Sequence, residues 1–162
     1  MAENRQAPFV GADFEPPSGL RARDFVLEPL GPQHNDADYA AWTPSIQHIR
    51  STSGFSTGSW PNDSISLDQN LSDLIRHADD FAARTGFTYT VLEPLTSQVM
   101  GCVYIYPSAD LQFDARVRSW VSAEHAAVDQ DLRRAVTEWL ARDWPFRSVD
   151  YYGRPAGSTG AE

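Results

Sequence analysis

The sequence predicts a single α/β domain with a mixed, mainly antiparallel sheet flanked by helices. Two runs rich in β-branched and aromatic residues, 98–107 and 115–123, lie close together in the chain. They lead directly into residues 128–140, where apolar side chains recur at the helical period. This order predicts two neighbouring strands and a helix that packs on their shared sheet.

The composition predicts one acidic globular unit. A chain of 162 residues is long enough for a single domain with a sizeable core. Its formal net charge is -9, and its basic residues are arginines. Because an acidic surface repels a phosphate backbone, nucleic acid is not an expected partner. A local arginine pocket would still suit a small anion.

Cysteine content and hydropathy predict a cytoplasmic protein without a membrane segment. Cys102 is the sole cysteine, which excludes an intrachain disulfide and a cysteine metal cluster. The first residues lack a signal-peptide pattern, and no apolar run approaches membrane-spanning length.

The first part of the chain predicts an arm, a strand and a short helix. Residues 1–23 are rich in proline and glycine and predict an extended or disordered arm. A strand is expected over 24–30. A short helix follows over 35–43, and Pro44 breaks it because proline removes a helical hydrogen bond.

A longer helix is expected next. Residues 51–64 form a loop rich in serine, threonine and glycine. Ser66 and Gln69 then have the spacing of a capping box at the start of a helix over 67–84. Gly86 suits its C-terminal cap.

The last elements complete the domain, which we expect to span residues 24–152. A strand over 87–92 precedes the two runs described above, and together they predict an antiparallel meander. A short strand over 148–152 follows the last helix, and residues 153–162 form a polar tail.

This order of elements resembles the GNAT family of N-acetyltransferases over about residues 24–152. Local patterns also match: Gly-Cys-Val-Tyr-Ile at 101–105, and a next strand that ends Ser-Trp-Val-Ser-Ala at 119–123. The resemblance implies a splayed sheet with acetyl-CoA between the two splayed strands. It also implies that the cofactor's pyrophosphate lies on the N-terminus of the helix after the meander, where free N–H groups and the helix dipole bind anions.

The sequence departs from the family where that pyrophosphate would bind. The family's loop there reads Arg or Gln, two residues, Gly, one residue, then Gly or Ala, whereas residues 122–131 contain neither glycine nor arginine. Asp129 and Asp131 stand in the first turn, where each stabilises the helix by about 0.3–1 kcal/mol but repels a phosphate. The family also continues with a helix and two strands, whereas ten residues follow Tyr152 here.

The resemblance implies a set of cofactor contacts. Val121, Ser122 and Ala123 would meet the pantetheine arm through main-chain groups, and the N–H near Val121 would polarise the acyl carbonyl. Arg133 and Arg134 would partly replace the missing phosphate loop.

The resemblance also implies an acceptor site for a small-molecule amine. The amine would lie near Trp60 and Tyr104, with Trp42 in the same aromatic wall. Glu124 or a water would take the proton of the amine, and Tyr152 would stand in for the tyrosine acid of the family. A small satellite core is the alternative explanation of the aromatic residues.

Two other features have chemical and structural explanations. Cys102 lies in an apolar strand without a neighbouring base, which favours packing over a nucleophilic role. His34, Asp36 and Asp38 have the spacing of metal ligands, but an acid-rich helix start explains them without metal. We therefore expect no metal site.

The favoured function is an N-acyltransferase that uses acetyl-CoA and a small-molecule amine. The first alternative is a non-catalytic module of the same fold that binds a ligand or a protein. The second is a CoA-independent enzyme in which Arg116 or Arg118 holds an anionic substrate. A homodimer that pairs through an exposed sheet edge is also expected.

Overall fold

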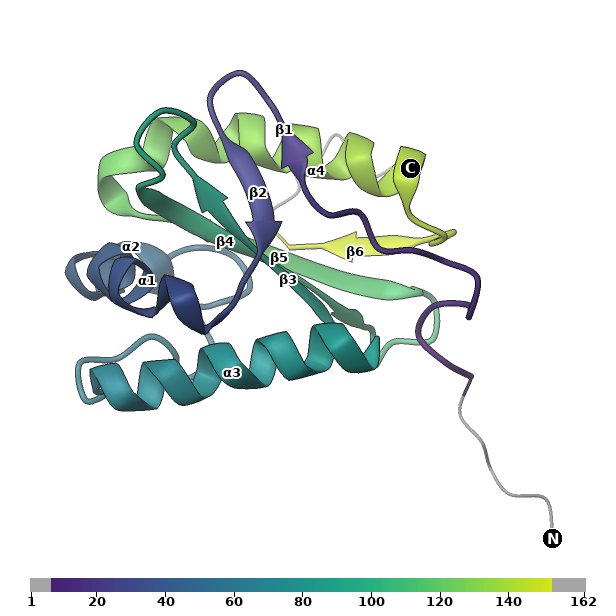
Figure 1. The fold of residues 1–162 in the computed structure, drawn as a ribbon, viewed down its shortest axis with the longest axis horizontal. Helices are drawn as coiled ribbons and strands as arrows, with labels where there is room; N and C mark the ends of the chain where they lie inside the picture. The colour runs from purple at the N-terminus through teal and green to yellow at the C-terminus, as the bar shows by residue number, and fades with distance from the viewer. Residues whose placement is uncertain (1–6, 153–162) are drawn as a thin grey trace, which may run out of the picture.

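A six-stranded sheet with helices on both faces forms the body of the protein (Figure 1). The computed structural model describes residues 7–152, so the expected tail at 153–162 and the first six residues of the arm lie outside the described residues. The strands are β1 (Leu20–Arg21), β2 (Val26–Pro29), β3 (Phe87–Leu92), β4 (Val99–Pro107), β5 (Ala115–Val121) and β6 (Val149–Tyr151). The helices are α1 (Asn35–Trp42), α2 (Ile46–Arg50), α3 (Leu67–Ala83) and α4 (Asp129–Asp143).

The strands lie in the sheet in their sequence order. Every neighbouring pair is antiparallel except β5 and β6, which run parallel. The predicted α/β class with a mainly antiparallel sheet is therefore confirmed. None of the helices within residues 7–152 combines the length and the apolar character that crossing a membrane requires.

The two faces of the sheet carry separate cores. Helix α4 covers one face, and α1, α2 and α3 cover the other (Figure 1). Side chains alternate along β5, so Val117 and Val121 pack in the core beneath α4, whereas Trp120 packs in the core beneath the other helices. This second core is the one that borders the candidate site.

The described part of the arm, residues 7–23, packs on the core beneath α4. Val10 is buried, and the ring of Phe9 stacks 5.1 Å from that of Phe146. Phe14 lies against Trp144 at 5.3 Å. The short strand β1 pairs with β2. Apolar and aromatic residues thus fix a segment whose proline and glycine content had suggested little structure.

Helix α3 begins as predicted and ends differently. The Ser66 side chain accepts from the Gln69 N–H at 3.1 Å, and Gln69 Oε1 accepts from the Ser66 N–H at 2.8 Å, which confirms the capping box. The predicted glycine cap is wrong, because Arg84 is the residue that adopts the left-handed conformation, with φ 65°. Gly86 instead admits the Tyr106 ring, since a Cβ there would lie 2.1 Å from Cε1.

The pairing of β5 with β6 stops part-way along β5. Three positions are in register, from Ala115 opposite Val149 to Val117 opposite Tyr151, and the Tyr152 N–H then donates to the Val117 carbonyl at 3.0 Å. Beyond Val117, β5 continues to Val121 without a described strand on that side. Among residues 7–152 the sheet is therefore open there, as the splayed sheet requires.

Candidate active site

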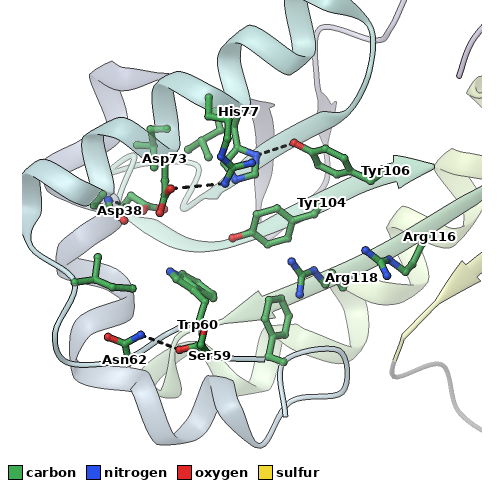
Figure 2. Close-up of a pocket in the computed structure, with 16 residues that line it drawn as sticks. Asp38, Ser59, Trp60, Asn62, Asp73, His77, Tyr104, Tyr106, Arg116 and Arg118 are labelled. Carbon is green, nitrogen blue, oxygen red and sulfur yellow. Dashed lines mark hydrogen bonds and ion pairs between the residues drawn. The ribbon is translucent and has the colours of Figure 1, made fainter. Parts of the chain in front are cut away.

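A cavity of about 510 Å³ lies on the face of the sheet that α1, α2 and α3 cover. Its walls come from helices α1 and α3, from the loop that precedes α3, and from β4 and β5 (Figure 2). The side chains that carry chemistry there are Asp38, Trp60, His77, Tyr104, Arg116 and Arg118.

Aromatic side chains form the floor and one wall of this cavity. Trp60 packs against Trp42, Phe55 and Trp120, with ring centroids 5.6, 5.8 and 5.9 Å away. Tyr104 accepts a hydrogen bond from Trp120 Nε1 at 2.9 Å, and burial raises the pKa of Tyr104 well above its usual value. Trp60 and Tyr104 line the cavity, whereas Trp42 is fully buried behind Trp60.

Asp38 is a buried carboxylate in the cavity wall. Burial raises its pKa to about 6, although the hydrogen bond from Asn70 Nδ2 to Oδ2, 3.1 Å long, acts in the opposite direction. No described residue forms a hydrogen bond with Oδ1. A carboxyl group with a pKa near neutrality suits proton transfer.

The metal hypothesis for this segment finds no support in its geometry. His34 accepts from the Gly31 N–H through Nδ1 at 3.0 Å, and its Nε2 lies 2.8 Å from Glu28. Asp38 turns away toward Asn70. Within residues 7–152 no group of three such side chains has the arrangement of a metal site.

His77 is a neutral ring in the cavity wall. Tyr106 donates its hydroxyl proton to Asp80 at 2.8 Å, and the Tyr106 oxygen lies 2.9 Å from His77 Nδ1 (Figure 2). Thr88 Oγ1 also lies 2.9 Å from Nδ1, so two hydroxyl groups hold this side of the ring. Burial lowers the pKa of His77 to about 4, so the ring is neutral at pH 7.

Two arginines of β5 line the opposite part of the cavity. Arg116 and Arg118 project from the same face of the strand and are both half-buried. The Arg118 guanidinium lies 4.7 Å from the centre of the Phe55 ring and 5.4 Å from that of Tyr104. Its Nη1 donates to the Gly54 carbonyl at 3.0 Å.

The open edge of β5 adjoins this cavity. The Val117 carbonyl points toward β6, and the Ser122 N–H points toward Met100 of the neighbouring strand β4. Since successive peptide groups alternate in direction, the main-chain groups of Ser119 and Val121 face the open edge. Arg118, which precedes Ser119, lines the cavity.

Comparison with solved structures places this arrangement in a known fold. No family model and no curated protein matches the sequence. The microcin C7 self-immunity acetyltransferase MccE, solved with acetyl-CoA and AMP, superposes with a TM-score of 0.58 and 12% identity, over 76% of this chain and 67% of that one. This chain has the GNAT acetyltransferase fold.

Two further GNAT-type structures agree. Ribosomal-protein-S5-alanine acetyltransferase from Vibrio fischeri has a TM-score of 0.57 and 12% identity, over 75% of this chain and 66% of that one. For a GCN5-related N-acetyltransferase from Brucella melitensis the values are 0.54 and 12%, over 80% and 57%. The resemblance seen in the sequence is thus confirmed for the fold.

Glu124 lies apart from the acceptor side of this GNAT fold. After β5 the chain enters a short 3₁₀ helix, Ala123–Val128, and the Ala123 N–H donates to Ser45 Oγ at 2.9 Å. Glu124 is exposed and lines a separate hollow of about 300 Å³ together with Gln98. The sequence predicts that Glu124 lies near Trp60 and Tyr104, but the structure places it apart from them.

The start of α4 is occupied by its own ion pairs. Arg133 Nε donates to Asp129 at 2.9 Å, and Arg134 Nη1 donates to Asp131 at 3.3 Å. Arg133 also donates to the Tyr152 carbonyl and is largely buried. The two arginines that were expected to replace the phosphate loop are thus both engaged within the chain.

Tyr152 lies where the two strands separate. Its N–H is bound to Val117, and a Cβ on Gly54 would lie 3.1 Å from its ring. Tyr152 therefore stays beside the open edge of β5, next to the loop that carries Phe55 and Trp60.

The polar side of α3 is the part of the site that sequence reasoning missed. Asn70, Asp73 and His77 all line the cavity. Their spacing of three and four residues places them on one stripe of the helix, next to the buried Leu74. The signal in the sequence is this polar stripe beside the apolar stripe of the same helix, which indicates a helix face turned toward a polar cavity.

Proposed function

We propose that this chain is an N-acyltransferase that moves an acyl group from acyl-CoA to an amine held in the cavity. The observation that carries the proposal is the edge of β5 beyond Val117. Main-chain groups there have no partner strand among residues 7–152, and they adjoin a cavity with a carboxylate of suitable pKa. The fold it shares with MccE, which was solved with acetyl-CoA, supports the same donor.

The residues present fit one part of acyl-CoA better than another. The free N–H and carbonyl groups of Ser119 and Val121 suit the amide groups of the pantetheine arm. The start of α4 suits its pyrophosphate poorly, because Asp129 and Asp131 stand there, and Asp129 Oδ1 is buried without a partner among residues 7–152. Ser122 and Ala123 lie between the end of β5 and the start of α4.

The chain's own groups would then divide the chemistry. Acyl-CoA supplies the acyl group as a thioester. The Val121 N–H donates to the acyl carbonyl oxygen and stabilises its developing charge. Asp38 takes the proton of the amine as the C–N bond forms, and Tyr152 donates a proton to the sulfur as the C–S bond breaks.

Calorimetry with acetyl-CoA and with CoA tests the donor half of the proposal. Saturable binding of both is expected, and absence of binding at millimolar ligand would contradict an acyl-CoA site. Release of free thiol in the presence of amines then tests transfer. Arg134→Ala is the informative variant because Arg134 is exposed: unchanged affinity would show that it does not replace the phosphate loop.

A non-catalytic ligand-binding module is the second candidate. The ion pairs at the start of α4 favour it, since they fill the place where the pyrophosphate would lie. In that case small amines would bind in the cavity while acetyl-CoA and CoA would not bind.

A further inference from the structure

The charges in the cavity are separated along its length. Figure 2 shows Asp38 and Asp73 on one side of Tyr104, and Arg116 and Arg118 on the other. A ligand that fills the cavity therefore meets Asp38 and the Asp73–Arg76 ion pair at one end, and the guanidinium groups of Arg116 and Arg118 at the other. This arrangement is complementary to a molecule with both an ammonium and an anionic group.

The two arginines have hydrogen-bonding capacity left for such a ligand. Within residues 7–152, no carboxylate lies within 4.0 Å of either guanidinium. This holds even though Asp150 is the register partner of Arg116 across β5 and β6. The chain has a net charge of -9, yet these two half-buried arginines on one cavity wall have no carboxylate partner among residues 7–152. They are therefore suited to bind an anionic ligand.

Arg118 is also held in place. Its guanidinium packs against Phe55 and Tyr104, and one of its nitrogens donates to Gly54, which leaves its other N–H groups for a ligand. A guanidinium fixed in this way binds carboxylate or phosphate oxygens with little further loss of conformational freedom. Arg116 precedes Arg118 by two residues on the same face of the strand, about 7 Å away.

The opposite end suits the amine. Asn70 donates to Asp38 Oδ2, whereas Oδ1 accepts no hydrogen bond from residues 7–152. Asp73 lines the same end, but Arg76 also lines the cavity, lies 3.7 Å from Asp73 and offsets its charge, so Asp38 is the carboxylate left for the amine. The His77 ring packs 5.4 Å from the Tyr104 ring and is neutral at pH 7, so it adds no repulsion to an ammonium group.

We infer that the acceptor is a small primary amine that also carries an anionic group, a carboxylate or a phosphate. The ammonium group lies toward Asp38, and the anionic group is bound by Arg116 and Arg118. The role of this ligand as an acyl acceptor rests on the proposed acyltransferase function. Its preferential binding in the cavity does not depend on acyl-CoA.

Matched pairs of amines test the inference without acyl-CoA. The probes are γ-aminobutyrate against butylamine, and O-phosphoethanolamine against ethanolamine. Their binding is followed by chemical-shift titration of the arginine Nε–H resonances, which detects millimolar affinity. The anionic member of at least one pair should bind roughly tenfold or more tightly and shift the Arg116 and Arg118 signals.

The pair that shows the preference distinguishes a carboxylate from a phosphate ligand. Equal affinities within both pairs, or shifts confined to other arginines, would overturn the inference. Arg116→Gln should abolish the preference. Since Arg116 forms no hydrogen bond with a described residue, the substitution should leave the fold intact. Arg142→Gln, the same charge change at an exposed site, should leave the preference intact.

Failure of the inference and failure of the proposed function give different results. If anionic amines bind preferentially but no acyl group is transferred, the cavity assignment stands and the acyltransferase proposal fails. If transfer occurs equally to neutral and anionic amines, the acyltransferase proposal stands and the assignment to anionic acceptors fails.

Discussion

Asp38 combines burial with a free oxygen in the cavity, and both properties bear on function. Its spacing from His34 and Asp36 allows a metal ligand, but an acid-rich helix start explains the same residues, and neither explanation predicts a proton acceptor. Asp38 Oδ2 accepts from Asn70, a residue 32 positions further along the chain. A contact of this kind cannot be predicted from local spacing, so the sequence alone does not indicate this role.

The pH dependence of transfer should follow Asp38. Its pKa of about 6 predicts that the rate falls below about pH 6, where the carboxyl group is protonated and accepts no proton. Asp38→Asn should lower kcat by about 100-fold or more at pH 7 and remove that limb of the profile. Asp36→Asn, an exposed neighbour on the same helix, is the control. If Asp38→Asn retained the full rate, another group would accept the proton of the amine, and His77 would be the first to examine.

The same substitution should stabilise the protein at neutral pH. A folded-state pKa raised from 3.8 to about 6 means that the native state binds a proton more tightly than the unfolded state does. Stability is therefore lost as pH rises from about 4 to 6, by about 3 kcal/mol at 1.4 kcal/mol per pKa unit. Urea unfolding should show Asp38→Asn more stable than the parent by up to that amount at pH 7. The gap should close near pH 4, and a gap independent of pH would contradict the assignment.

At the scale of elements, helix α3 and strand β4 were predictable to within about one residue, and their local signals explain why. The capping box fixes the start of α3, and alternation fixes the strands. The end of α3 was predicted wrongly because Gly86 is required by the neighbouring Tyr106 ring, a contact with another element. Arg84 takes the cap position and donates to the carbonyls of Gly11 and Phe14 in the arm.

Removing the N-cap of α3 should weaken the helix that carries one wall of the cavity. Ser66→Ala leaves the Gln69 N–H without its acceptor and should cost about 1 kcal/mol in the free energy of unfolding. Ser72→Ala, at an exposed position within the same helix, should change stability by less than half of that. Equal effects of the two substitutions would mean that the cap does not contribute specifically.

Strand β4 should not tolerate a side chain at its glycine. A Cβ on Gly101 would lie 2.1 Å from the Trp120 carbonyl oxygen of β5, and a backbone atom within a sheet cannot move aside. Gly101→Ala should therefore cost about 3 kcal/mol or more, or prevent folding. Gly58→Ala, where a Cβ meets open space, is the matched control in the same denaturation assay.

At the scale of the whole molecule, the order of elements was enough to indicate the GNAT fold, because hydrophobic period and turn signals survive at 12% identity. The composition of the cavity was not predictable in the same way. Its walls come from segments that lie far apart in the sequence, and only their packing places the α3 stripe opposite Arg116 and Arg118. The position of Glu124, the base predicted from the sequence, depends on packing in the same way: the chain enters a 3₁₀ helix after β5, and Glu124 lines a separate hollow.

The division of the aromatic residues between the two cores has a practical consequence for spectroscopy. Trp42, Trp60 and Trp120 belong to the core beside the cavity, whereas Trp139 and Trp144 belong to the core beneath α4. Trp60 is the tryptophan that lines the cavity itself. Intrinsic fluorescence should therefore report ligand entry without any label, and Trp60→Phe should remove that signal while emission from the other face continues to report unfolding.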